Sequence, residues 1–284
     1  MSQPDPLIQN ISDTARWAAV YRARESERPD ALFHDPFARR LAGARGEQIA
    51  DGMPFSNKTV WAWVTRTYLF DHFITEQLGQ GVDLVVNLAA GLDARPYRMP
   101  LPASLKWVEV DLPELLNYKE EILANEKPVC NLERVRLDLS NVAARRELFE
   151  RLGRDAKKAL IITEGLLIYL SAEEVGALAT DLAVPPSFQR WVHEVHSPGL
   201  LRLMMKNMGT VMNQAGAPFK FAPAEGPSFF THYGWKPIEV RSMLKTAAKL
   251  RRLSFFMRLI ALLPESTGAQ GNRPWSGICL QGKQ

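Results

Sequence analysis

The spacing of apolar residues along the chain changes near residue 82. Before that point they recur at intervals of three and four, as in Val60, Trp63 and Val64. This period is typical of amphipathic helices. Three helices are predicted in order: one capped by Ser12 or Asp13 and running to about Glu27, a short one begun by Asp35-Pro36, and one capped by Ser56 and ended by Gly79 and Gly81.

From residue 83 onward, short apolar runs alternate with helical stretches. The predicted strands are Asp83–Leu88, Leu105–Val110, Val135–Leu137, Ala159–Thr163 and Trp191–Val195. The predicted helices between them cover about 112–125, 142–152 and 172–183. This alternation implies βαβ units and a parallel sheet, so we expect a doubly wound α/β fold.

The pattern changes again after residue 197. Residues 198–213 predict a Met-rich amphipathic helix, and 216–226 a loop. Two final strands are expected at 234–241 and 275–281, with a helix near 237–250 and a second one ending at Leu263 between them. The alternation in 275–281 is typical of an antiparallel edge strand.

Composition narrows the class of protein. The chain has 284 residues, 46% of them hydrophobic and 23% charged, which suits one large soluble domain, alone or with a cap. The net charge is +4, and the basic cluster in 245–258 is interpreted as the solvated face of a helix. We therefore expect no nucleic acid and no membrane partner. Two cysteines give neither a disulfide framework nor a metal site, and no signal peptide is recognised, so a cytoplasmic location is expected.

Polar and small residues follow the first two predicted strands. The first strand ends at Asn87, and small residues continue to Gly91. Such a turn lets the backbone approach a nucleoside closely. The second strand ends at Asp111, about 20 residues after the turn, where an acid binds ribose hydroxyls in dinucleotide folds. The alternative for Asp111 is a helix cap ahead of Pro113.

The third and fourth strands end in similar motifs. Asp138 and Leu139 suit an adenine, although Asp138 or Ser140 could instead cap the next helix. Glu164 and Gly165 follow the fourth strand. Carboxyl ends of parallel strands meet at one edge of the sheet, so the four motifs together predict a ligand site there. The glycine pattern is incomplete for a pyrophosphate, which argues against NAD.

Four runs of the chain, VVNLAAGLDARPYRM, EVDLP, LDL and ITEGLLIYL, resemble the leucine carboxyl methyltransferase family, in particular its bacterial branch that includes the tetracenomycin C carboxyl methyltransferase. The resemblance extends from about residue 12 to the end. It implies a Rossmann-like class I methyltransferase fold whose seven-stranded, mostly parallel sheet has its last strand antiparallel. It divides residues 1–284 into an N-terminal helical cap (1–80), a cofactor-binding core (81–197), a cap insertion (198–232) and a C-terminal part that completes the sheet (233–284).

The same resemblance implies S-adenosyl-L-methionine as cofactor. By motif position, Arg66 should bind the methionine carboxylate of the cofactor, and Glu164 with Gly165 should lie near its amino group. The turn from Asn87 through Ala89, Ala90 and Gly91 should lie near the methionine and the ribose. Asp111 with Leu112 should bind the ribose, and Asp138 and Leu139 should contact the adenine. Arg22 corresponds to a basic residue of the first helix. Members of the family commonly carry glycine where this chain has Ala89, so a positive φ there would strain the site.

We expect an O-methyltransferase that methylates a carboxylate of a small, polyketide-like molecule to a methyl ester, with a phenol or other hydroxyl as the alternative acceptor. A monomer or homodimer without a metal is expected. A carboxylate acceptor needs no general base, because it is ionised at pH 7. A phenol or alcohol acceptor would need one, and His193, His196 and His232 are candidates. Tyr169 either orients the acceptor through its phenol or only packs against neighbouring side chains. A cofactor-binding protein without catalysis and an NAD-dependent oxidoreductase are the other readings that we weigh.

Overall fold

The computed structural model describes residues 8–9, 11–53, 56–265 and 273–284. Three helices come first: α1 (Ile11–Ser26), α2 (Ala38–Gly52) and α3 (Ser56–Gly79). The strands are β1 (Leu84–Leu88), β2 (Lys106–Asp111), β3 (Asn131–Arg136), β4 (Ala159–Thr163), β5 (Phe188–His196), β6 (Trp235–Ser242) and β7 (Ser276–Lys283). The other helices are α4 (Arg95–Arg98), α5 (Pro113–Ile122), α6 (Val142–Asp155), η1 (Leu167–Tyr169), α7 (Ala172–Ala183), α8 (Pro198–Gln214), η2 (Gly226–Tyr233), α9 (Met243–Lys249) and α10 (Phe255–Ala261).

The seven strands form one sheet in the order β3-β2-β1-β4-β5-β7-β6. Strands β1 to β5 pair in parallel, and β7 is antiparallel to both of its neighbours. The predicted doubly wound fold with an antiparallel last strand is thereby confirmed. The prediction that 275–281 is an edge strand was wrong, because β7 lies between β5 and β6 and is buried along most of its length.

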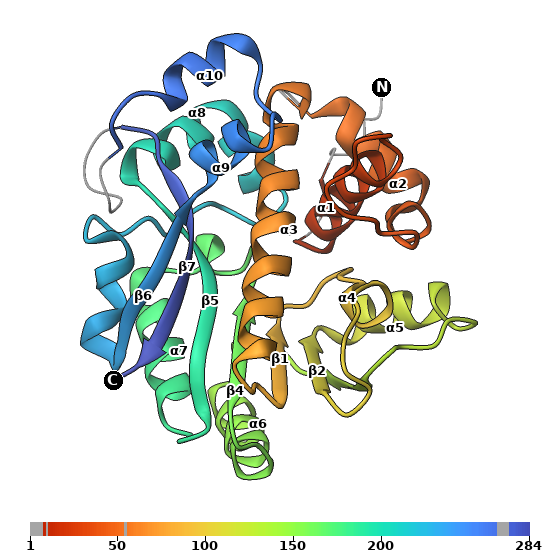
Figure 1. The fold of residues 1–284 in the computed structure, drawn as a ribbon, viewed down its shortest axis with the longest axis vertical. Helices are drawn as coiled ribbons and strands as arrows, with labels where there is room; N and C mark the ends of the chain where they lie inside the picture. Colours follow the sequence, from red (N-terminus) through yellow and green to blue (C-terminus); the bar gives the residue numbers. More distant parts are fainter. Residues whose placement is uncertain (1–7, 10, 54–55, 266–272) are drawn as a thin grey trace.

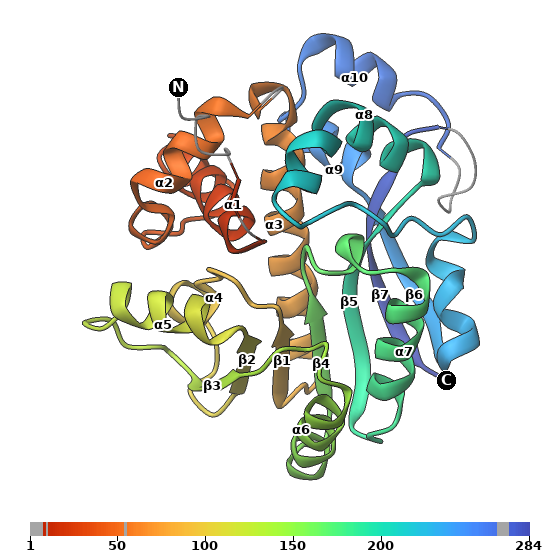
Figure 2. The same ribbon diagram turned by 180° about the vertical axis from the view of Figure 1, so that it is seen from behind.

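Helices cover both faces of the sheet. Helix α3 crosses one face, where Phe70 and Phe73 pack against side chains such as Trp107 and Ile162 (Figure 1). Helices α6 and α7 lie on the other face, seen from behind in Figure 2, and bury residues such as Leu152 and Leu182. Both faces of the central strands are therefore dry, which explains their unbroken apolar runs.

A second apolar cluster joins the N-terminal helices to α8 above the carboxyl ends of the strands. Trp17 and Val20 of α1 belong to it, together with Leu41 of α2 and Met212 of α8. The Met-rich helix predicted at 198–213 is thus confirmed, and Met204, Met208 and Met212 pack in this cluster. The N-terminal helices and α8, which follows β5 in the chain, therefore cover one end of the sheet together.

Several predicted boundaries were wrong for local reasons. Helix α1 begins at Ile11, so Ser12 and Asp13 lie in its first turn instead of capping it. Helix α2 begins only at Ala38, because the Asp35 carboxylate accepts the backbone N–H of Phe37 and forms a turn ahead of it. That helix is also longer than expected, with 15 residues and a kink at Gly43.

Two further boundaries shifted in the sheet. Strand β3 starts at Asn131, four residues earlier than predicted, because this edge strand is only half buried and shows no apolar run. Residues 237–242 belong to β6 and only 243–249 are helical. No helix among the described residues is long and apolar enough to cross a bilayer.

Candidate functional site

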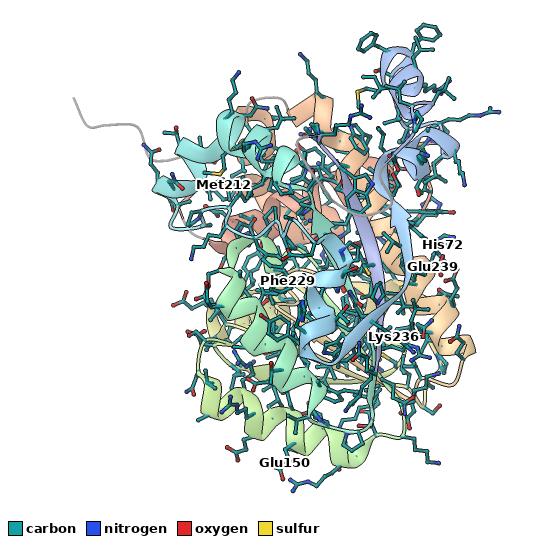
Figure 3. The ribbon with its side chains drawn as sticks, turned by 90° about the vertical axis from the view of Figure 1, so that its left-hand side faces the viewer. His72, Glu150, Met212, Phe229, Lys236 and Glu239 are labelled. Atoms are coloured by element: carbon teal, nitrogen blue, oxygen red, sulfur yellow. The ribbon has the colours of Figure 1, made fainter. Side chains whose placement is uncertain are left out.

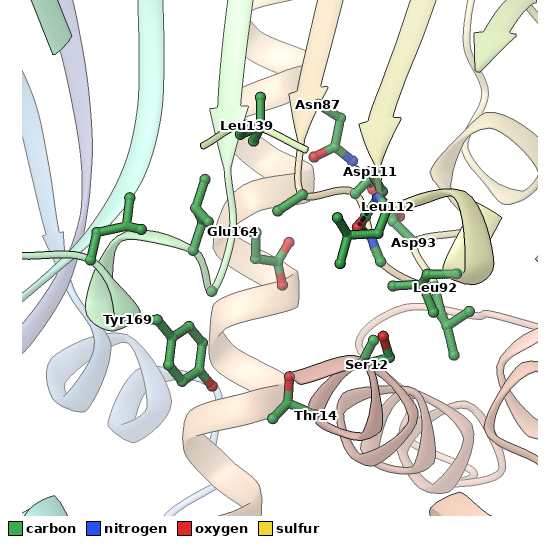
Figure 4. A pocket seen from close by; sticks show the side chains of 18 of the residues that line it. Ser12, Thr14, Asn87, Leu92, Asp93, Asp111, Leu112, Leu139, Glu164 and Tyr169 are labelled. Carbon is green, nitrogen blue, oxygen red and sulfur yellow. Dashed lines mark hydrogen bonds between the residues drawn. The ribbon is translucent and has the colours of Figure 1, made fainter. Parts of the chain in front are cut away.

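A cavity of about 400 Å³ lies between the carboxyl ends of β1, β2 and β4 and helix α1 (Figure 4). This volume lies within the usual range for small-molecule sites. The cavity contains every predicted cofactor-binding residue: Arg22, Arg66, Asn87, Ala89, Ala90, Gly91, Asp111, Leu112, Asp138, Leu139, Glu164 and Gly165. Tyr169 also lines it, whereas His193 does not. The four strand-end motifs thus meet as the parallel topology requires.

The turn after β1 has an unusual backbone. Ala89 has φ 52° and Gly91 has φ 54°, both in the left-handed region. A Cβ on Gly91 would lie 3.3 Å from the Cβ of Ala15 in α1, so the turn and the helix approach closely. Glycine adopts this conformation without strain, but Ala89 carries a Cβ and is strained. The suspected conflict between alanine and this position is therefore present.

Asp111 ties the ends of β1 and β2 together. One carboxylate oxygen accepts the backbone N–H of Gly91 at 2.6 Å, and the other accepts that of Leu112 at 2.7 Å. Burial raises the pKa of Asp111 above its ordinary value, although these two hydrogen bonds act in the opposite direction. Each carboxylate oxygen has a second lone pair, so a ligand hydroxyl can still be accepted. The cap alternative was wrong, because Leu112 is the N-cap of α5.

The turn after β3 forms the side of the cavity near α6. Asp138 accepts the backbone N–H of Ser140 at 2.8 Å. Helix α6 is capped by Asn141, whose side chain accepts from the backbone N–H of Ala144. The alternative in which Asp138 or Ser140 caps this helix was therefore wrong. Leu139 offers an apolar side chain to the cavity.

Arg66 of α3 joins two carboxylates behind the turn after β4. Its Nε lies 3.0 Å from Glu164, and its Nη1 lies 3.1 Å from Glu194 of β5. Gly165 has φ 69°, and a Cβ there would lie 3.4 Å from Nη1 of Arg66. The left-handed backbone is what favours glycine at 165, since a Cβ would only be in ordinary contact with the guanidinium. Sequence reasoning missed Glu194, because it lies inside strand β5 and not in the turn after a strand, where site residues were expected.

Arg95 extends this group of charges toward the turn after β1. It lies 2.8 Å from Glu164, 2.9 Å from Asp93 and 2.6 Å from Asp71. Arg98 shares Asp71 at 2.8 Å. Because each of these acids is held by a buried arginine, the wall of the cavity is a fixed set of paired charges.

Arg22 links α1 to the same group. Its Nε lies 2.9 Å from Asp35, and its Nη2 donates to the backbone carbonyl of Leu92 at 2.6 Å. Asp35 lies 3.7 Å from Arg98, which completes the connection. We call the whole set the arginine–carboxylate network; its members are Arg22, Asp35, Arg66, Asp71, Asp93, Arg95, Arg98, Glu164 and Glu194.

The network shifts the pKa values of its acids in different directions. Burial raises the pKa of Asp93, but Arg95 and the neighbouring cations outweigh it and hold that pKa at about 2. Glu194 has an elevated pKa, because burial outweighs the attraction of Arg66. Asp93 therefore stays ionised at neutral pH, whereas Glu194 accepts a proton more readily than an exposed glutamate.

Tyr169 faces the cavity opposite Asp111, and Figure 4 shows its ring directed toward Thr14 of α1. It stacks on Phe219, with 5.8 Å between ring centroids. Burial raises its pKa to about 12. Tyr169 is therefore a protonated phenol at neutral pH, which can donate a hydrogen bond but cannot serve as a base.

The assignment of His193 as a catalytic group was wrong. Its ring lies on the other face of β5, 4.3 Å from the ring of Phe230 and 4.8 Å from that of Trp191, and it has no exposed surface. Burial lowers its pKa to about 4. His196 and His232 are also absent from the described residues that line the cavity.

Comparison with known proteins gives a consistent result for sequence and fold. A family model described as leucine carboxyl methyltransferase matches residues 15–183. A protein of Parafrankia sp. (strain EAN1pec), provisionally named an S-adenosyl-L-methionine-dependent methyltransferase, is 34% identical over 259 residues, which is 85% of this chain and 82% of that protein. A protein of the same provisional name from Frankia alni is 31% identical over 249 residues, covering 84% and 88% of the two chains.

Solved structures agree in fold. A provisionally named methyltransferase from Thermobifida fusca YX aligns with a TM-score of 0.60 at 15% identity, covering 99% of this chain and 97% of that one. A DUF574 family protein from Streptomyces avermitilis aligns with a TM-score of 0.58 at 14% identity, covering 95% and 97%. At identities of 14–15%, these alignments show a shared fold only.

Replacing Ala89 by glycine should stabilise the protein. The left-handed conformation costs alanine about 1–2 kcal/mol, and the extra freedom of glycine in the unfolded chain costs about 0.5–1 kcal/mol. Ala89→Gly should therefore raise the free energy of unfolding by about 0.5–1 kcal/mol in denaturant titrations. The control is Ala90→Gly, since Ala90 has no positive φ and should lose stability. An equal change in the free energy of unfolding for the two variants would contradict the strain at Ala89.

Replacing His193 by phenylalanine should flatten the acid side of the stability profile. The folded pKa of about 4 lies below the unfolded value of about 6.5, so the unfolded chain binds the proton first as pH falls. His193 thus removes stability as pH falls from about 6.5 to 4, by roughly 3 kcal/mol. Denaturant titrations of His193→Phe at pH 7 and 5 should show a smaller difference than the unmodified protein, and methyl transfer should persist. His232→Gln, at an exposed position, is the control.

Proposed function

The chain belongs to the leucine carboxyl methyltransferase family and is an S-adenosyl-L-methionine-dependent methyltransferase, and from this premise we propose that it methylates a carboxylate of a small molecule to give a methyl ester. The observation that carries this proposal is that the acids lining the cavity are paired or hydrogen-bonded and that Tyr169 is protonated. None of these groups is suited to remove a proton from an alcohol or phenol. A carboxylate acceptor does not need such a group.

The residues present fit the cofactor. The turn after β1 has two residues at positive φ and a small-residue surface, so backbone can lie close to a nucleoside. Asp111 retains acceptor capacity for ribose hydroxyls, and Leu139 offers an apolar surface for the adenine beside Asp138. Glu164 provides a negative charge for the amino group, and Arg66 a positive charge for the carboxylate. These assignments of individual residues are part of the proposal.

When bound, the cofactor supplies a methyl group on a positively charged sulfur, which is already a strong electrophile. The protein's contribution is to hold the acceptor oxygen in line with that methyl group. Such alignment contributes roughly 7–11 kcal/mol to lowering the barrier. The cavity wall suits this task, because the arginine–carboxylate network fixes its shape through ion pairs of 2.6–3.1 Å around Arg66 and Arg95.

Each acid among the described residues that line the cavity already forms an ion pair with an arginine or accepts a backbone hydrogen bond. Asp93 and Glu164 are paired with arginines, and Asp111 accepts two backbone N–H groups. Asp138 and Glu174 also accept backbone N–H groups, from Ser140 and Ser171. Because Tyr169 is protonated and no histidine belongs to the described lining, the cavity favours an acceptor that is already ionised.

The acceptor pocket favours an apolar body on that carboxylic acid. The lining residues on the side of α7 and η1 are mostly aliphatic: Leu166, Leu170, Ala177 and Leu178. Tyr169 stands at this side and can donate a hydrogen bond to one carboxylate oxygen. This side chain is therefore proposed as a positioning residue for the acceptor.

Methylation of a phenol or other hydroxyl is the second candidate. Glu194 supports this candidate, because its raised pKa makes it a better proton acceptor than an ordinary glutamate, and a hydroxyl acceptor must lose a proton. The reading of a binding protein without catalysis predicts cofactor affinity but no turnover.

Asp111→Ala should weaken binding of S-adenosyl-L-methionine at least tenfold, roughly the effect of losing one charge-assisted hydrogen bond. Calorimetry with the cofactor measures this directly, and circular dichroism verifies that the variant is folded. Glu114→Ala is the matched control, because Glu114 is an exposed acid three residues away that does not line the cavity. Unchanged affinity in a folded Asp111→Ala variant would refute the ribose assignment.

The acceptor class can be tested with cofactor carrying a labelled methyl group. We expect label transfer to apolar carboxylic acids, and a product that mild base hydrolyses, because esters are base-labile and ethers are not. Transfer to phenols with a base-stable product would overturn the carboxylate proposal. Binding without transfer to either panel would favour the non-catalytic reading. Tyr169→Phe should raise KM for the acceptor while leaving cofactor affinity unchanged.

A further inference from the structure

Helix α10 exposes large apolar side chains to solvent. Phe255 is 78% exposed, Phe256 70% and Leu262 80%. The whole exposed set, which we call the α10 face, consists of Phe255, Phe256, Leu259, Ile260, Leu262 and Leu263. A gathering of this kind on a soluble protein marks a site of interaction.

The spacing shows that the apolar side of the helix is directed outward. Within α10, the exposed residues Phe255, Phe256, Leu259 and Ile260 follow the helical repeat and share one side, and Leu262 and Leu263 come directly after the helix. Met257 and Ala261 lie on the opposite side and pack with Ala247 and Leu253. The helix is thus anchored by two small contacts while its larger apolar surface stays free. Figure 3 shows α10 projecting from one end of the molecule.

The surroundings of the α10 face are strongly basic. Residues 198–214 and 243–263, which cover α8, α9 and α10, contain seven Lys or Arg residues and no Asp or Glu. Figures 1 and 2 both place α8 and α10 at the same end of the molecule. Lys245, Lys249, Arg251 and Arg258 are exposed there. Arg252 has a different role, since it pairs with Glu25 and Asp30.

We propose that the α10 face docks on an anionic lipid bilayer. Aromatic and leucine side chains enter the boundary between headgroups and acyl chains, while the surrounding cations contact lipid phosphates. Both halves of this recognition are present within one short segment of the chain. The composition of the whole sequence led us to expect no membrane partner, because an average over the chain does not reveal a local combination of basic and exposed apolar side chains.

Charge complementarity selects a bilayer over a second copy of this chain. A two-fold dimer through the α10 face would bring Lys249, Arg251 and Arg258 close to the same residues of the partner. Residues 198–214 and 243–263 contain no acid that could pair with them, and the acids nearby are already engaged: Glu25 and Asp30 with Arg252, and Glu265 with the hydroxyl of Ser242. An anionic surface instead attracts every one of these cations over about 8–10 Å at physiological ionic strength.

The test is sedimentation of the full chain with vesicles. Vesicles of equal parts phosphatidylglycerol and phosphatidylcholine should bind the protein, and vesicles of phosphatidylcholine alone should bind it much less. The double variant Phe255→Ser with Phe256→Ser should lower the partition coefficient by roughly tenfold. Lys249→Glu with Arg258→Glu should abolish the preference for phosphatidylglycerol, and high salt should reduce binding of the unmodified chain.

The control is Val184→Ser, which removes an apolar side chain that is 71% exposed at the end of α7, outside the α10 face. This variant should bind vesicles like the unmodified protein. No binding of the unmodified chain to phosphatidylglycerol vesicles would overturn the proposal, as would equal loss in Val184→Ser. Concentration-dependent dimerisation that the Phe255→Ser, Phe256→Ser variant abolishes would also overturn it in favour of self-association. These readouts do not depend on methyl transfer.

Discussion

Pairing of four largely buried arginine side chains with carboxylates around one cavity is the constraint on which this structure depends. A buried guanidinium without a partner is strongly unfavourable, so each one must meet a carboxylate with good geometry. Arg66 and Arg95 meet Glu164 between them, and the remaining pairs extend the network to Asp35 in the connection between α1 and α2. The positions of α1, α3 and the turns after β1 and β4 are thereby fixed relative to one another. The cavity has its shape because these charges must be paired.

The strand-end motifs could be located from sequence for a topological reason. In a parallel sheet the residues after each strand meet at one edge, so Asn87, Asp111, Asp138 and Glu164 were brought together by chain order alone. Their detailed partners depend on packing between distant segments. Glu194 could not be recognised, since it lies within strand β5 and not after a strand end, and its partner Arg66 comes from the distant helix α3. The edge strand β3 was hard to delimit, because half-buried residues show no continuous apolar run.

Ala89 shows how a departure from a local rule is connected with a site. Its backbone is in the left-handed region, and the two residues after it are fixed by hydrogen bonds, since Ala90 donates to the carbonyl of Val110 and Gly91 donates to Asp111. Sequence alone identified the conflict but not its outcome, because φ is set by these tertiary hydrogen bonds. Strain that surrounding contacts impose is common where backbone lines a ligand site.

The position of β7 between β5 and β6 has a consequence for synthesis of the protein. Both neighbours precede β7 in the chain, with Phe188–His196 separated from it by about 80 residues. A nascent chain therefore presents one open edge of β5, a strand of nine residues, for the whole time in which α8, β6 and α10 are made. An unpaired edge is a template for association with other chains. Ribosome-bound intermediates of this protein should accordingly be clients of chaperones that cover exposed strands until β7 emerges and inserts.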